Sequence, residues 1–123
     1  GVLPVTETSH VIQASMTAGD RDVLRQAGPT AAVLQADRVA LPLTVRSRRP
    51  GDRLKPLGAP GSKKVQDLLV DRKVPYAERD LVPIVEDAEG RILWVAGVAM
   101  ADQARVTRPE AGVVILQMKK DQA

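Results

Sequence analysis

The sequence predicts a mixed α+β domain with more strand than helix. Short runs rich in Val, Ile and Leu recur between turn residues, which is typical of strands. The clearest helical spacing of apolar residues lies in one segment, 62–73. A chain of 123 residues is about the size of one domain and is long enough to bury a core. We therefore expect a single domain over residues 1–123.

The first part of the chain is expected to form strands around one short helix. Residues 9–17 and 31–34 have the composition of strands, and 41–46 alternates apolar and polar side chains. Residues 20–27 are expected to form the helix, with Asp20 as its N-cap. The apolar face of this helix should contain Val23, Leu24 and Ala27.

The principal helix is expected over 62–73. Ser62 follows a glycine, and its hydroxyl can accept a hydrogen bond from an amide of the first turn. Three apolar residues then share one face, namely Val65, Leu68 and Leu69. Pro75 ends the helix, because the residue before a proline is disfavoured in helical geometry.

The rest of the chain is expected to form a short helical turn over 75–80 and a hairpin. The hairpin strands are 82–86 and 92–95, and residues 87–90 supply the Asp and Gly typical of the turn. A last strand, 112–118, is rich in β-branched residues.

Aromatic side chains are rare, with one Trp, one Tyr and no Phe. Aliphatic residues must therefore build the core, and Trp94 is expected to pack within it. Proteins that hold single-stranded nucleic acid usually stack bases on aromatic rings. Only Tyr76 lies in the basic part of this chain. Contacts with the phosphates and riboses of a folded or duplex RNA suit this composition better.

Positive charge is concentrated in one third of the sequence. Residues 46–79 contain ten Lys or Arg and four Asp or Glu, a local balance of +6. The rest of the chain has eight against eleven, a balance of −3. Such segregation is typical of proteins that bind a polyanion, although an ordinary solvated face can have the same composition.

The basic segment contains a stiff loop, 49–64, with three prolines, three glycines and five cationic side chains. Its prolines restrict the free loop and so lower the cost of ordering it on binding. Lys63 and Lys64 are expected in the first turn of the principal helix, where the helix dipole is already positive. A phosphate bound by the free amides, Ser62 and the two lysines would compensate these charges.

No catalytic or metal centre can be assembled from the sequence. The chain has no cysteine, His10 lacks partner ligands and is expected at the surface, and the loop lacks P-loop spacing. Four carboxylates lie close to cations and are expected to form ion pairs: Asp52, Asp67, Asp71 and Asp80. The lack of cysteine, of a signal peptide and of a long apolar segment indicates a cytoplasmic protein without membrane contact.

An ordered set of short motifs extends over residues 41–108. Its members are Pro42-Leu43-Thr44-Val45-Arg46-Ser47-Arg48-Arg49-Pro50-Gly51-Asp52-Arg53, Pro56-Leu57-Gly58, Gly61-Ser62-Lys63-Lys64, Asp67, Asp71-Arg72-Lys73-Val74-Pro75, Arg79-Asp80, Pro83 and Trp94-Val95-Ala96-Gly97-Val98. In this order and with these gaps they resemble the C-terminal domain of bacterial tRNA(Ile)-lysidine synthase.

The resemblance implies a β-rich sandwich flanked by helix, similar to a domain of the phenylalanyl-tRNA synthetase β chain. It implies that the full-length enzyme uses ATP to adenylate the wobble cytidine of the CAU-anticodon isoleucine tRNA and then joins lysine to it. That work belongs to an N-terminal ligase domain with its ATP and Mg, so no catalysis and no cofactor is expected in this chain. The expected partners are tRNA(Ile), on its acceptor-stem side, and the ligase domain of the same protein.

The expected contacts with tRNA phosphates come from every cation of the basic segment and from one serine: Arg46, Arg48, Arg49, Arg53, Lys55, Ser62, Lys63, Lys64, Arg72, Lys73 and Arg79. The alternative is a docking module that orients the ligase domain by pairing its basic face with an acidic protein surface, without contacting RNA.

Overall fold

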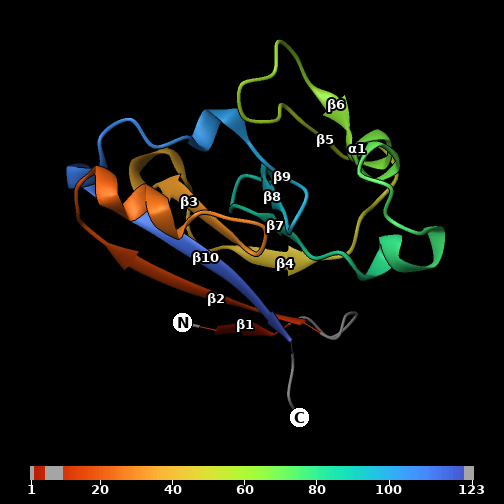
Figure 1. The fold of residues 1–123 in the computed structure, drawn as a ribbon, viewed down its shortest axis with the longest axis horizontal. Helices are drawn as coiled ribbons and strands as arrows, with labels where there is room; N and C mark the ends of the chain where they lie inside the picture. The colour runs from red at the N-terminus through yellow and green to blue at the C-terminus, as the bar shows by residue number, and fades with distance from the viewer. Residues whose placement is uncertain (1, 5–9, 121–123) are drawn as a thin grey trace.

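The computed structural model describes residues 2–4 and 10–120. Within these residues the chain forms two four-stranded antiparallel sheets, a two-stranded ribbon and one α-helix, joined by short 3₁₀ helices (Figure 1). The expectation of a strand-rich mixed fold with one main helix is confirmed.

The first sheet brings the two ends of the described chain together. Its strands, in spatial order, are β1 (Val2–Pro4), β2 (His10–Thr17), β10 (Val113–Lys120) and β3 (Ala31–Gln35). The long strand β10 pairs with β2 on one side and with β3 on the other. The strands expected over 9–17, 31–34 and 112–118 are thus present, although Ser9 lies outside the described residues.

The second sheet is built from short strands. In spatial order they are β4 (Thr44–Arg46), β7 (Ile84–Glu86), β8 (Ile92–Val95) and β9 (Ala99–Met100). The expected hairpin is confirmed as β7 and β8, with a register shift between Val85 and Glu86. Its first strand begins at Ile84, because the 3₁₀ helix η3 (Tyr76–Leu81) runs further than the expected turn over 75–80.

The second sheet is the middle layer of three. On one face Val85 and Leu93 join a core with Leu116 of the first sheet. On the other face Ile84 packs with α1 (Val65–Asp71). Since the sheet is covered on both faces, all four residues of β8 are buried and the strand shows no alternation of apolar and polar side chains. Trp94, as expected, is one of these core residues.

Helix α1 is shorter than the expected 62–73, although its buried face is confirmed as Val65, Leu68 and Leu69. It ends in a Schellman motif, not at Pro75. Lys73 adopts a left-handed φ of 56°, its amide donates to the Val70 carbonyl, and the Val74 amide donates to Leu69.

The short helix expected over 20–27 is the 3₁₀ helix η1 (Arg21–Gln26). Asp20 caps it as expected, accepting a hydrogen bond of 2.8 Å from the amide of Asp22. Val23 packs on the outer face of the first sheet, but Leu24 and Ala27 are exposed. The tighter 3₁₀ turn changes which side chains share a face, so the expected apolar face is wrong for these two residues.

The remaining elements are short connections: η2 (Ala36–Arg38), β5 (Arg53–Leu54), β6 (Lys63–Lys64), η4 (Asp102–Ala104) and η5 (Pro109–Ala111). In the part of the chain that the structure describes, no helix has the length and hydropathy needed to cross a bilayer.

Candidate nucleic-acid interface

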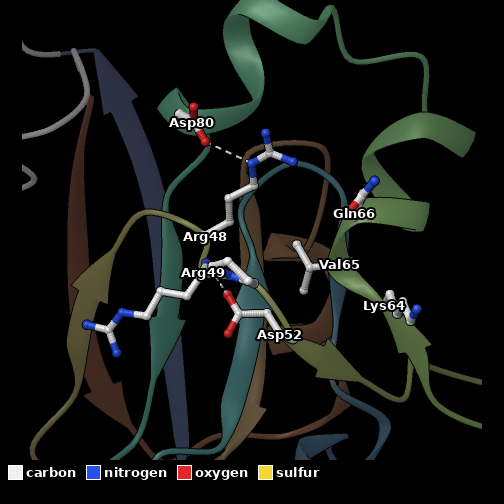
Figure 2. A pocket seen from close by; sticks show the side chains of 9 residues that line it. Arg48, Arg49, Asp52, Lys64, Val65, Gln66 and Asp80 are labelled. Carbon is white, nitrogen blue, oxygen red and sulfur yellow. Dashed lines mark hydrogen bonds and ion pairs between the residues drawn. The ribbon is translucent and has the colours of Figure 1, made fainter.

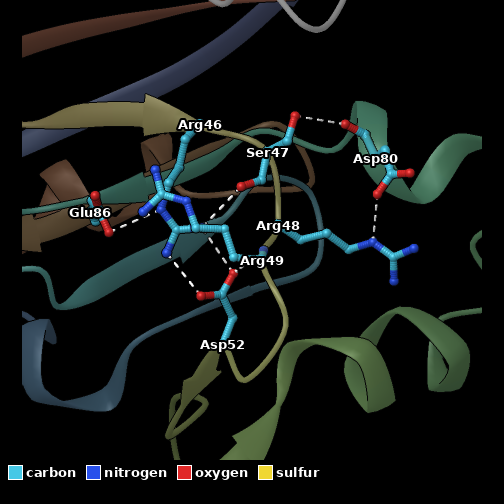
Figure 3. A network of polar contacts seen from close by, with 7 residues as sticks. All are labelled: Arg46, Ser47, Arg48, Arg49, Asp52, Asp80 and Glu86. Atoms are coloured by element: carbon cyan, nitrogen blue, oxygen red, sulfur yellow. Dashed lines mark hydrogen bonds and ion pairs between the residues drawn. The ribbon is translucent and has the colours of Figure 1, made fainter.

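Arg46, at the end of β4, is held inside the protein by an ion-pair network. Its Nη1 and Nη2 donate to the two carboxylate oxygens of Asp52, each at 2.9 Å, and its Nε donates to Glu86 at 3.1 Å (Figure 3). Only 11% of the Arg46 side chain is exposed. All three guanidinium nitrogens are thus bonded to protein acceptors, so Arg46 holds β4, Asp52 and Glu86 together.

A tight turn follows over Arg49–Asp52. Pro50 and Gly51 take its two central positions, Gly51 with a φ of 87°, and the Asp52 amide donates to the Arg49 carbonyl at 3.2 Å. This is the pattern of a type II turn, which needs a residue able to adopt positive φ at its third position. The Asp52 carboxylate also accepts a bond of 2.7 Å from the Arg49 amide, so both ends of the turn are joined.

The Asp52 carboxyl is held in its ionised form. Burial acts to raise its pKa, but hydrogen bonds from Arg46 and the Arg49 amide and the positive charge of Arg46 outweigh burial and lower the pKa below its ordinary value. The pKa of Arg46 is raised, chiefly by its hydrogen bond to Asp52. The pair therefore stays charged at neutral pH.

A surface pocket of about 390 Å³ lies between this turn, η3 and the start of α1. It is lined by Arg48, Arg49, Pro50, Gly51, Asp52, Lys64, Val65, Gln66 and Asp80 (Figure 2). Arg48 donates from Nε to Asp80 at 2.8 Å, while its two terminal nitrogens form no hydrogen bond to the described residues. In Figure 2 the side chains of Arg48, Arg49 and Lys64 point in different directions, so the three cations frame the pocket and do not converge on one point.

The expected phosphate site at the helix start is wrong in its geometry. Lys63 and Lys64 form strand β6, and α1 begins only at Val65, with Lys64 as N-cap and no side-chain cap. Ser62 instead accepts hydrogen bonds from Nε and Nη2 of Arg53, at 3.3 and 3.2 Å, across the ribbon. Pairing with β5 keeps the two lysines extended, since it satisfies backbone groups that a longer helix would have used.

The loop at the tip of this ribbon is anchored by Asp102, a residue that the sequence did not single out. Its carboxylate accepts from the Gly58 amide at 3.0 Å and pairs with Lys55 and Arg105, at 3.5 and 3.0 Å. The hydrogen bond from Gly58 is the main cause of a lowered Asp102 pKa, and the two cations add to it against a smaller opposing effect of burial. No local spacing indicates a contact between residues more than forty positions apart.

The remaining cations of the basic segment lie at the end of α1 and on η3. Arg72 and Lys73 are exposed and form no side-chain hydrogen bond or ion pair with the described residues. Arg79 donates to the Val74 carbonyl at 3.1 Å, and its guanidinium lies 5.4 Å from the ring centre of Tyr76. Lys63 pairs with Asp71 at 3.4 Å.

Three of the four carboxylates form ion pairs as expected: Asp52, Asp71 and Asp80. Asp67 forms none with the described residues. Glu86 was not anticipated as a partner of Arg46, because the pairing depends on β4 lying beside β7. Four cationic side chains of the segment form no hydrogen bond or ion pair with the described chain, and these are Arg49, Lys64, Arg72 and Lys73. His10 lies in β2, but its side chain is outside the described part.

Comparisons with known proteins agree with the ordered motifs. Residues 43–117 match the family model described as the TilS substrate C-terminal domain. The chain is 42% identical over 99 residues to the tRNA(Ile)-lysidine synthase of Geobacillus kaustophilus, covering 80% of this chain and 21% of that protein. It is 52% identical over 79 residues to the synthase of Symbiobacterium thermophilum, covering 64% and 16%. The chain thus spans about a fifth of the length of such relatives.

Two solved structures share the fold. The "Crystal structure of TILS C-terminal domain" has a TM-score of 0.84 and 36% identity, covering all of this chain and 92% of that one. An N-terminal fragment of the phenylalanyl-tRNA synthetase β-subunit from Pyrococcus horikoshii has a TM-score of 0.70 at 16% identity, covering 87% and 38%, and shows the fold alone. The resemblance and the expected fold are both confirmed.

Proposed function

This chain belongs to the family of TilS substrate C-terminal domains, and we propose that it is the tRNA-recognition part of a tRNA(Ile)-lysidine synthase. In this proposal the parent enzyme is a cytoplasmic ligase that joins lysine to the wobble cytidine of tRNA(Ile) with ATP. The ligase chemistry, ATP and Mg belong to another part of the parent. This chain binds the tRNA backbone on the acceptor-stem side and carries no catalytic group.

The observation that carries the proposal is the pocket framed by Arg48, Arg49 and Lys64. Arg49 and Lys64 have no side-chain partner in the described chain, and Arg48 keeps two unbonded nitrogens. Arg49 and Lys64 are exposed and 20% of the Arg48 side chain is exposed, so free donors at the rim of the pocket are available to phosphate oxygens, which accept charge-assisted hydrogen bonds. Their divergent directions favour several phosphates along a backbone over one enclosed anion.

The scarcity of aromatic side chains favours contacts with the RNA backbone over stacking on RNA bases. Trp94 is 3% exposed and belongs to the core, so only Tyr76 is available at the surface. One ring cannot form the series of stacking contacts typical of single-strand binders. The proposed phosphate contacts are Arg48 and the four cations that form no side-chain hydrogen bond or ion pair with the described chain, namely Arg49, Lys64, Arg72 and Lys73. Arg46 is left out because its guanidinium is bonded within the protein.

The proposal is tested by titrating the 123-residue chain against an in vitro transcript of the CAU-anticodon isoleucine tRNA at several salt concentrations. If about five cations meet phosphates, log affinity should fall with log salt at a slope of roughly −4. Reversing two charges, Arg49→Glu with Lys64→Glu, should weaken binding at least tenfold and make the slope shallower by about 1.5.

The matched control reverses two charges elsewhere, Arg21→Glu with Arg25→Glu. Both lie on η1, which packs on the outer face of the first sheet, and the net charge changes equally. The control should retain most of the affinity. Equal losses in the two variants would indicate nonspecific attraction, and no RNA affinity in the unsubstituted chain would favour the docking module that pairs with acidic protein surface.

A further inference from the structure

We infer that Asp52 is a positioning residue of the basic pocket, an acidic side chain on which binding of the RNA polyanion depends. It holds the Arg49–Asp52 turn, and with it Arg48 and Arg49, in the orientation that meets phosphate. The inference rests on the function proposed above and adds to it a residue whose charge is opposite to that of the RNA contacts.

The geometry around Asp52 requires a carboxylate. Its Oδ2 accepts from Arg46 Nη1 at 2.9 Å and from the Arg49 amide at 2.7 Å, and its Oδ1 accepts from Arg46 Nη2 at 2.9 Å. A carboxylate offers acceptors on both oxygens, whereas an asparagine offers one oxygen and a donating NH₂ group. In Asp52→Asn the NH₂ group therefore faces an Arg46 nitrogen in either orientation, and in one of the two it faces the Arg49 amide as well, so a donor meets a donor.

Asp52 also joins the two elements that supply the pocket cations. Its backbone carbonyl accepts from the Val65 amide at 2.9 Å, at the start of α1 and next to Lys64. Its carboxylate bonds the amide of Arg49 at the other side of the pocket. Losing the carboxylate bond would leave the turn attached to α1 and Arg48 bonded to Asp80, but it would remove one of the two bonds that join the ends of the turn and so loosen the hold on Arg49.

The RNA affinity should change in opposite directions on removal of the Asp52 charge, depending on whether Asp52 acts only through that charge or by positioning the arginines. Asp52 lines the pocket, so removing its negative charge should strengthen phosphate binding if only the local field matters. Removing it should weaken binding if the carboxylate fixes the two arginines, because an unfixed side chain loses entropy on binding. The direction of the change therefore identifies the role.

The experiment measures binding of the tRNA(Ile) transcript by the 123-residue chain and by its Asp52→Asn variant over a salt series. We expect a roughly tenfold loss of affinity and a slope shallower by about 0.7 to 0.9 for each phosphate that the variant no longer binds. Asp87→Asn is the matched control, since Asp87 is buried, is paired with an arginine and does not line the pocket. It removes the same charge and should leave the affinity unchanged.

Two further variants separate positioning from loss of fold. Gly51→Ala changes no charge, and its added methyl group meets nothing within 4 Å, but a side chain strains the backbone at a φ of 87°. It should therefore disturb the turn and weaken RNA binding as Asp52→Asn does. It can replace Asp52→Asn if that variant unfolds. In a chain that already carries Arg48→Ala and Arg49→Ala, Asp52→Asn should have no further effect.

The inference is overturned if the unsubstituted chain binds and Asp52→Asn binds equally or more tightly. It is also overturned if the loss persists in the background without Arg48 and Arg49, because Asp52 would then act through the fold as a whole. Failure of the unsubstituted chain to bind RNA would refute the proposed function itself, and the inference with it.

Discussion

Arg46 and Arg49 are three residues apart and carry the same charge, but the fold gives them different roles. Arg46 is bonded to two carboxylates and is nearly buried, whereas Arg49 is exposed and has no side-chain partner in the described chain. Removing Arg46 leaves Asp52 and Glu86 as partly buried, uncompensated charges. We expect Arg46→Ala to lower the free energy of unfolding by about 3 kcal/mol, because a buried charge loses its partner.

Urea denaturation of Arg46→Ala, with Arg49→Ala as the control, measures this difference. The control should change the unfolding free energy by less than about 0.5 kcal/mol, as is usual for an exposed side chain without partners. Similar losses in the two variants would contradict the distinction between the two arginines.

The sequence predicts a stiff and basic loop in this segment, but not which cations remain free. Pro50 and Gly51 specify a turn by their own backbone preferences, whatever surrounds them. The partner of Arg46 on β7 depends on strand pairing, which brings together residues forty positions apart. For that reason composition alone does not separate the cations that are bonded within the protein from those that are not.

At the scale of the element, the local spacing of apolar residues predicts which face of α1 is buried but not where the helix begins and ends. The spacing of Val65, Leu68 and Leu69 is a property of the helix alone, and it was predicted. The predicted start of the helix is wrong because Ser62 and the two lysines pair across a ribbon with Arg53 and Leu54, nine to eleven positions earlier. Ribbon pairing competes with helix formation for the same backbone groups, and a helix signal does not reveal that competitor.

Strand β3 illustrates how one element is joined to a distant segment by a single side chain. Gln35 is fully buried and accepts from the amides of Thr107 and Arg108 at 2.9 and 2.8 Å. Its amide nitrogen donates to the carbonyls of Arg108 and Gly112 at 2.9 and 3.2 Å. It thereby bonds four backbone groups of the segment that leads into β10. The two carbonyls also accept from the amides of Ala111 and Ala36, so the amides of Thr107 and Arg108 depend most on Gln35.

We expect Gln35→Leu to lower the free energy of unfolding by about 3 kcal/mol, since the partly buried bonds to the amides of Thr107 and Arg108 are lost. The comparison is Gln103→Leu, the same chemical change at an exposed residue of η4 that should cost little stability. Thermal unfolding followed by circular dichroism measures both variants. An equal decrease in Tm would show that the Gln35 bonds do not hold the segment.

At the scale of the whole molecule, three carboxylates connect its layers and loops, and the pKa of each is lowered by its hydrogen bonds: Asp52, Asp87 and Asp102. Asp87 is the most internal, at 3% exposed. Burial acts to raise its pKa, but the Arg91 guanidinium and the amides of Arg91, Ala40 and Glu89 outweigh burial. A carboxyl with a lowered pKa in the folded state binds fewer protons than it does in the unfolded chain.

The stability that these carboxylates contribute should therefore be fully present above the ordinary carboxyl pKa and be lost as the pH falls below that value through the lowered ones. Asp87→Asn should be less stable than the unsubstituted chain at pH 7 but should lose less on acidification, because one of the three carboxyls no longer takes up a proton. Urea denaturation at a series of pH values measures both effects. A parallel decline in the two chains would mean that Asp87 contributes nothing to acid sensitivity, and that the hairpin turn it occupies is held by its backbone bonds alone.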